Sequence, residues 1–170
     1  LMHITERLGL NSGLPVTAAE GEILTAYEKL FIEEDFLFLR CGPTITLSSD
    51  FGITIVSVPR ADRFSARVKL VMVPSSSLSP AQIKNVISVA SATQEAEQKL
   101  LVIERPTQPL IIVSEVELQR PYTPDDLSRV FNDFASNTDV ALGEAIRGGA
   151  DAEQFAESVG LGSRILGSRF

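Results

Sequence analysis

The chain has 170 residues, of which 44% are hydrophobic and 22% charged, a composition typical of one globular domain that buries its own core. Fifteen Lys and Arg against 22 Asp and Glu give a formal net charge of −7. This acidity argues against a nucleic-acid-binding protein, whose affinity would rest on cations that meet phosphates, and it favours a neutral or basic partner.

The first 16 residues mix apolar residues with Asn, Gly and Pro, and they predict one helical turn at most, followed by a loop. A helix is predicted from Thr17 to about Glu34. Thr17 and Glu20 have the S/T-x-x-E spacing of a capping box, in which each side chain bonds the other residue's backbone N–H. One apolar face then follows at helical spacing, formed by Ile23, Leu24, Tyr27, Leu30 and Phe31.

Strands are predicted over the next 40 residues. Residues 36–41 form a short apolar run that Gly and Pro close. Residues 44–58 alternate apolar and polar positions on both sides of Ser49-Asp50 and predict a hairpin. Residues 67–73 alternate in the same way and predict a half-buried strand, while the intervening residues 59–63 predict a loop.

A second helix is predicted from the N-cap residue Ser79, with Pro80 at the first helical position and Gln82 completing a capping box. We expect its polar, alanine-rich second half to continue to Lys99. Two further strands are predicted at 100–104 and 110–118; the prolines between them favour a stiff connection and an edge position in the sheet.

The third helix is predicted from Thr123 to Arg147, with a possible kink near Gly143. Gly148-Gly149 indicates a boundary, which divides the chain into an α+β domain of residues 1–147 and a flexible or short-helical tail of residues 148–170. The expected fold class is α+β: a single antiparallel sheet with three main helices, in the order α-β-β-β-(β)-α-β-β-α, and with the helices mainly on one face.

Side chains that commonly carry catalysis are scarce. His3 has no Cys or His at ligand spacing, and Cys41 has no neighbouring His to activate it, so we expect a terminal histidine and a buried structural thiol. Glu115 and Glu117 share a strand face and are the candidates for acid–base work or a hard metal ion, although a solvated strand face explains them equally well. We therefore expect no catalytic residue, no metal and no cofactor.

The hypothesis that this protein binds a partner rests on the predicted strand 110–118. Its first four residues are apolar on both faces, so we expect a dimer partner or a client peptide to cover the second face of the sheet. Phenylalanines on the first predicted strand are further candidates for exposed contacts. The candidate partner-binding residues are Phe36, Phe38, Leu110, Ile111, Ile112 and Val113.

The order of elements resembles that of class I type III secretion chaperones and of the sensory-transduction-regulator family that shares their fold. The most similar stretch begins with LSPAQI at Leu78–Ile83, continues to Leu118, and resumes with YTPDDL at Tyr122–Leu127. The resemblance implies a small acidic cytosolic homodimer that binds the extended N-terminal segment of a secreted protein by strand addition and apolar grooves. It carries over no site residue, because these families have no catalytic motif.

The sequence thus favours a non-enzymatic, chaperone-like protein-binding module that holds an extended segment of a partner or secreted protein. The alternative is a structural or assembly subunit of a larger complex or particle. A third hypothesis is an enzyme that uses Glu115 and Glu117. No secretory signal and no run of 18 apolar residues is present, and Cys41 is the only cysteine, so we expect a cytoplasmic protein without a membrane span.

Overall fold

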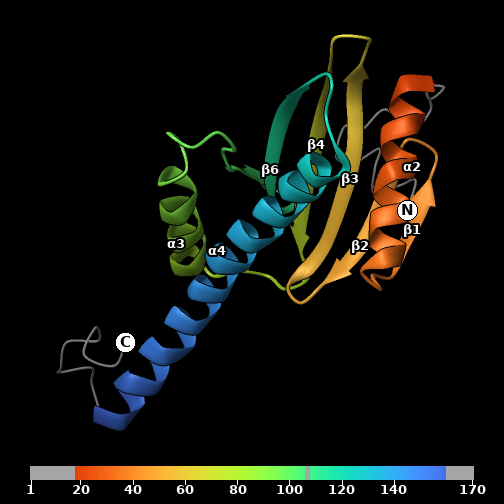
Figure 1. The fold of residues 1–170 in the computed structure, drawn as a ribbon. Helices are drawn as coiled ribbons and strands as arrows, with labels where there is room; N and C mark the ends of the chain where they lie inside the picture. Colours follow the sequence, from red (N-terminus) through yellow and green to blue (C-terminus); the bar gives the residue numbers. More distant parts are fainter. Residues whose placement is uncertain (1–17, 106–107, 160–170) are drawn as a thin grey trace.

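The computed structural model describes residues 18–105 and 108–159, and there it contains three helices and one six-stranded antiparallel sheet (Figure 1). The helices are α2 (Ala18–Glu33), α3 (Pro80–Ser91) and α4 (Pro124–Val159). The strands are β1 (Phe38–Cys41), β2 (Thr44–Ser49), β3 (Gly52–Ala61), β4 (Ser65–Pro74), β5 (Leu101–Arg105) and β6 (Gln108–Gln119), in the spatial order β1-β2-β3-β4-β6-β5. The predicted fold class and element order are confirmed.

The three helices cover one face of the sheet (Figure 1). Their apolar sides join alternate strand residues in one buried cluster that includes Tyr27, Phe31, Leu70, Ile112 and Phe134. Because side chains alternate along a strand, the residues between these strand positions point to the opposite face, called the second face below.

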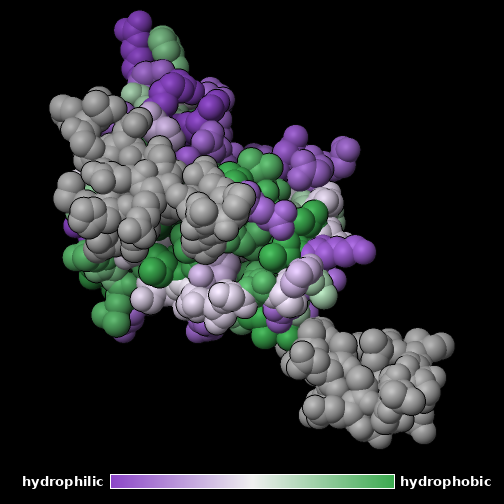
Figure 2. Space-filling view, turned by 180° about the vertical axis from the view of Figure 1, so that it is seen from behind, coloured by the Kyte–Doolittle hydropathy of each residue, from purple (hydrophilic) through white to green (hydrophobic). Residues whose placement is uncertain are grey.

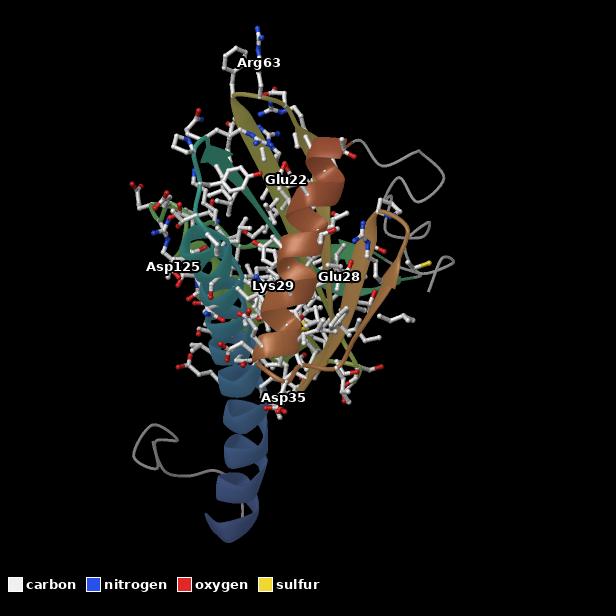
Figure 3. All side chains as sticks on the ribbon, turned by 45° about the vertical axis from the view of Figure 1, so that its right-hand side comes forward. Glu22, Glu28, Lys29, Asp35, Arg63 and Asp125 are labelled. Atoms are coloured by element: carbon white, nitrogen blue, oxygen red, sulfur yellow. The ribbon has the colours of Figure 1, made fainter. Side chains whose placement is uncertain are left out.

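Helix α2 ends in a Schellman arrangement, with a left-handed residue just beyond the helix. Asp35 has φ 61°, Phe36 N–H donates to the Phe31 carbonyl at 2.8 Å, and Asp35 N–H donates to the Ile32 carbonyl at 3.2 Å. The rings of Phe36 and Phe31 then pack with their centroids 6.0 Å apart. Figure 3 shows Asp35 at this end of the helix, where the chain turns into β1.

The predicted capping box of α3 is present: Ser79 Oγ accepts from the Gln82 N–H at 3.2 Å, and Gln82 Oε1 accepts from the Ser79 N–H at 2.8 Å. The predicted end at Lys99 is wrong, because α3 stops at Ser91. Past that point the sequence lacks an apolar stripe to pack against the sheet, and turns connect α3 to β5.

Helix α4 starts with the same reciprocal bonds between Thr123 and Asp126. Its backbone stays helical to Val159, so the predicted helix end near Arg147 is wrong. Gly148-Gly149 lowers helix propensity but does not break the helical hydrogen-bond ladder as proline would. The division into a domain of residues 1–147 and a tail of residues 148–170 stays a prediction.

Candidate functional site

The second face of the sheet carries an apolar cluster separate from the main core. It consists of Ile53, Ile55, Val71, Val73, Ile103, Ile111 and Val113. The strand register explains the cluster, because Ile55 pairs with Val71, Val71 with Val113, and Val113 with Leu101, which gives one continuous row across β3, β4, β6 and β5. Seen from this side, hydrophobic residues gather between more polar margins (Figure 2).

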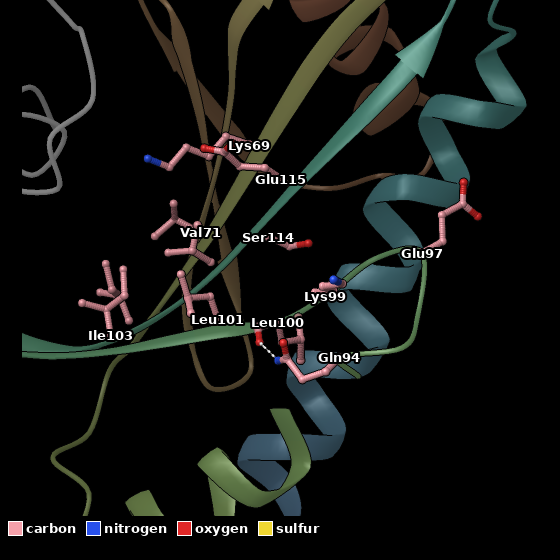
Figure 4. Close-up of a pocket in the computed structure, with 12 residues that line it drawn as sticks. Lys69, Val71, Gln94, Glu97, Lys99, Leu100, Leu101, Ile103, Ser114 and Glu115 are labelled. Atoms are coloured by element: carbon pink, nitrogen blue, oxygen red, sulfur yellow. Dashed lines mark hydrogen bonds between the residues drawn. The ribbon is translucent and has the colours of Figure 1, made fainter. Parts of the chain in front are cut away.

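A cavity of about 680 Å³ opens at the β5 end of this row (Figure 4). Its apolar part comes from residues on β4, β5 and β6, among them Val71, Leu101 and Val113. Charged side chains of both signs line it as well: Lys69, Glu97, Lys99 and Glu115. Apolar contact with a balanced charged rim suits a polypeptide segment of mixed composition.

Beside this cavity, β6 has an unpaired edge. β5 pairs with β6 only as far as Val113, whereas β4 continues to pair with β6 up to Gln119. Among the described strands, residues 114–119 therefore have a neighbour on one side only. Such an edge presents backbone N–H and C=O groups to any strand that approaches.

The direction of these groups follows from one hydrogen bond. Arg120 N–H donates to the Phe64 carbonyl at 2.8 Å, on the β4 side. The β4–β6 register has no shift, and backbone groups alternate in direction along an antiparallel strand. The N–H and C=O groups of Glu115 and Glu117 therefore point away from β4, toward the open side.

A second cavity, of about 180 Å³, lies on the helix side of the same edge. Val116 and Leu118 of β6 line it together with Val130 of α4, and Glu97 lines both cavities. The open edge therefore runs between a hollow on each face of the sheet.

Two buried polar atoms beside this edge lack partners within the described structure. Ser114 Oγ belongs to a residue that lines the larger cavity, and Gln98 Oε1 belongs to a residue that lines the smaller one. The amide nitrogen of Gln98 donates to the Val130 carbonyl at 3.1 Å, which holds the connection after α3 against α4. Buried polar atoms normally have a hydrogen-bond partner, so these two suit a ligand with donor groups.

The carboxylates of Glu115 and Glu117 are exposed and face arginines. Arg67 lies 3.6 Å from Glu115 and 3.9 Å from Glu117, and Arg60 also pairs with Glu117. In the described parts of the chain, no group of three or more His, Cys, Asp and Glu side chains is placed to hold a metal ion.

The six residues predicted to bind a partner fall into three places. Ile111 and Val113 lie on the second face and line the larger cavity. Leu110 and Ile112 point to the helices and belong to the main core.

Phe38 is the first residue of β1 and Phe36 lies just before it, at the sheet edge farthest from β5. Both rings pack against Phe31, with ring centroids 6.0 Å apart. Phe38 is half-buried and Phe36 remains 42% exposed. The structure therefore does not bring these rings together with Ile111 and Val113.

Val71, Leu101 and Ile103 line the larger cavity but were not predicted as binding residues from the sequence. The signal for Val71 was present, since Val71 and Val73 occupy the positions of strand 67–73 that should be polar if one face were solvated. The open edge had no sequence signal, because it depends on where β5 starts relative to β6.

The remaining features considered from the sequence are Cys41, His3 and a membrane-spanning helix. Cys41 is free and half-buried, which corrects the expected buried thiol, and its pairing with Thr44 at the edge of the sheet places it on the second face. His3 lies outside the described residues. None of the helices in the described parts of the chain is long and apolar enough to cross a membrane.

Comparison with known proteins gives little to place beside this geometry. No protein-family model matches the chain, and no curated protein does. The fold is similar to the crystal structure of YbjN from E. coli, a candidate transcription regulator, over 73% of this chain and 91% of that chain, with 12% sequence identity and a TM-score of 0.49. A likeness at this level assigns neither family nor function.

Proposed function

We propose that this chain is a non-enzymatic protein-binding module that holds an extended segment of a partner protein as an added strand along the open edge of β6. The observation that supports this proposal most directly is that the backbone N–H and C=O groups of Glu115 and Glu117 point away from β4, along an edge that lies between two cavities. These two residues offer two N–H donors and two C=O acceptors that the sheet leaves unpaired. Backbone bonds of this kind bind an extended peptide largely independently of its sequence.

The two cavities set the pattern of the bound segment. Side chains of an added strand point alternately to the two faces of the sheet. On the helix side they meet apolar Val116, Leu118 and Val130 beside charged Arg129 and Asp133. On the second face they meet apolar Leu101 and Val113 beside charged Lys69 and Glu115. The best partner segment therefore carries apolar and charged residues on both of its faces.

The finer proposal is a chaperone-like role. An extended strand is available only in a segment that its own protein has not folded, as in the unfolded N-terminal region of a secreted protein. The resemblance of Leu78–Leu118 to secretion chaperones supports this client class, a cytoplasmic location and a homodimeric state. The formal charge of −7 supports clients that carry excess positive charge.

Random 12-residue peptides displayed on phage and selected on the immobilised protein test the binding mode. Enriched peptides should combine apolar and charged residues, and each should then be titrated against wild type, Glu115→Ala and Glu115→Pro. Alanine keeps the outward N–H, whereas proline removes it without breaking a bond to β4. We expect Glu115→Pro to weaken binding at least tenfold and Glu115→Ala to bind nearly as well as wild type.

Urea denaturation of each variant serves as the folding control, since proline also restricts φ. Equal affinity of the enriched peptides for wild type and folded Glu115→Pro would overturn strand addition at this edge. Enrichment no greater than on an unrelated acidic protein would overturn the binding function itself.

A further inference from the structure

We propose that two copies of this chain pair through their β1 strands, antiparallel and around a two-fold axis at Leu39, so that the two sheets join into one. β1 lies at one margin of the sheet, beside α2 (Figure 1), and among the described strands it has a neighbour on one side only. The inference does not depend on the partner site at β6, which lies toward the other margin of the sheet.

Exposed apolar side chains are concentrated around β1. In the described residues, eight large hydrophobic side chains are exposed, and four of them lie within eight positions of one another: Ile32, Phe36, Leu37 and Leu39. Leu37 is 88% exposed and Leu39 is 54% exposed. Exposed apolar surface that gathers in one place commonly indicates an interaction site.

β1 also lacks the features that usually keep an edge strand from pairing with another molecule. Such edges are commonly protected by charged side chains, proline or a bulge. The only charged side chain of β1 is Arg40, and its guanidinium already pairs with Glu28 of α2 in the same copy. The register between β1 and β2 runs without a shift. The strand therefore presents a regular edge whose one charge is compensated.

The connection between β1 and β2 shows which backbone groups of β1 are free. A two-residue turn at 42–43 joins the strands, so the flanking residue Cys41 bonds the backbone of β2. Backbone groups alternate in direction along an antiparallel strand, so those of Leu39 face β2 as well. The N–H and C=O groups of Phe38 and Arg40 therefore point to the open side.

One antiparallel register uses all of these free groups. Phe38 of each copy then faces Arg40 of the other, and each of these two pairs exchanges both backbone hydrogen bonds. A register centred on Arg40 would instead set the two arginines directly opposite each other, which like charges disfavour. A register centred on Phe38 would pair Arg40 with Phe36. The Phe36 N–H is not free for this, because it donates to the Phe31 carbonyl at 2.8 Å.

The same register brings apolar side chains together on the second face. Phe38 packs against the main core, so its neighbours Leu37 and Leu39 alternate to the second face, together with Cys41. Leu39 meets Leu39 of the second copy on the axis, and Leu37 meets Cys41 of the second copy on either side of it. The patch is therefore complementary to itself, as a two-fold interface requires.

This pairing has a consequence for partner binding. β1 and β5 are the two opposite margins of the sheet, so the joined sheet keeps both open β6 edges, one toward each end. A partner with two suitable segments then gains from binding both sites at once. Because β1 has only four residues, we expect a dimer that forms at high protein concentration rather than a permanent one.

Disulfide trapping of the full chain tests the register. Leu39→Cys with Cys41→Ser places one thiol per copy on the axis, where the two Cα atoms lie about 4.5 Å apart, within the span of a disulfide. Leu101→Cys with Cys41→Ser, at a position of β5 that is 59% exposed, measures cross-linking by random collision. Under oxidation by copper–phenanthroline, we expect the Leu39→Cys variant to form covalent dimer at least about tenfold faster than the Leu101→Cys variant.

Leu37→Cys gives a second test that does not require a change at Leu39. With native Cys41 present, the new thiol faces Cys41 of the second copy, and we expect a covalent dimer. In the Cys41→Ser background the two new thiols lie four residues apart along the paired strands, about 13 Å, and we expect no dimer above the collision rate.

Urea denaturation of each variant serves as the folding control. Cross-linking of Leu39→Cys no faster than that of Leu101→Cys would overturn the proposal, and so would equal cross-linking of Leu37→Cys in both backgrounds. Faster cross-linking of Leu101→Cys would place the contact at β5 and would also overturn it. Peptide binding at β6 is measured separately with the phage-selected peptides, so the failure of one proposal leaves the other standing.

Discussion

Tyr27 of α2 shows how one buried hydroxyl joins two helices of this fold. Its OH donates to the Leu127 carbonyl of α4 at 2.9 Å, and the residue is completely buried. Burial raises the pKa of Tyr27 well above its usual value, so the hydroxyl remains a donor at all pH values at which the protein is handled.

Replacing Tyr27 with Phe removes this bond and leaves the ring in place. We expect Tyr27→Phe to lower the free energy of unfolding by about 1 kcal/mol, measured by urea denaturation. Tyr122→Phe is the matched control, because the buried hydroxyl of Tyr122 has no partner among the described residues. An equal loss in both variants would show that the Tyr27 bond contributes nothing specific.

Asp139 of α4 gives a pH-dependent prediction. Partial burial, and secondly the negative charge of Asp50, raise the pKa of Asp139 above its usual value. Folding therefore favours the protonated carboxyl: no penalty exists below the unfolded-state pKa of about 3.9, and a penalty develops as the pH rises through the folded-state pKa. We expect Asp139→Asn to be slightly more stable than wild type at pH 7 and equal to it near pH 3. A stability gain that persists at pH 3 would contradict this cause.

At the scale of single elements, the cap of α3 is the simplest to test. Removing the Ser79 hydroxyl leaves the Gln82 N–H without its partner. We expect Ser79→Ala to cost about 1 kcal/mol of stability, measured as a shift in the urea midpoint followed by circular dichroism. Ser77→Ala is the control in the same loop, since Ser77 is exposed and forms no described hydrogen bond. A urea midpoint of Ser79→Ala that is no lower than that of Ser77→Ala would show that the cap does not stabilise this helix.

The elements that the sequence predicted well are those with local signals. Ser79 and Thr123 announce their helices because capping is decided within four residues, and the hairpin of β2 and β3 follows from alternation around Ser49-Asp50. The end of α3 was missed because nothing local stops a helix at Ser91.

The candidate site could be predicted only in part for a related reason. The apolar run at Leu110–Val113 correctly indicated that both faces of β6 contact apolar groups. Which residues share a cavity depends on register, and the open edge depends on β5 starting opposite Val113. Both are set by contacts between segments far apart in the sequence.

At the scale of the whole molecule, the β1 side of the sheet is a second place for association. β1 is an edge strand, and nearby Leu37 and Leu39 are 88% and 54% exposed. We expect the protein to self-associate through this edge at high concentration, and Leu37→Lys with Leu39→Lys to shift it to monomer in light scattering coupled to size exclusion. Leu101→Lys, on the other edge strand, is the control. Self-association that persists in the double variant but disappears in the control would place the interface at β5 instead.

The length of helix α4 predicts how fast its backbone amides exchange with solvent along the helix. An α-helix of 36 residues is about 54 Å long, longer than the roughly 40 Å of 12-residue β6, and its buried side chains end at Ala145 among the residues with described side chains. Beyond the sheet a helix keeps only its own marginal stability. Amide protons should therefore exchange slowly from Leu127 to Ala145 and progressively faster toward Val159. The exchange rates along this one helix would then show at which residue packing against the rest of the protein ends.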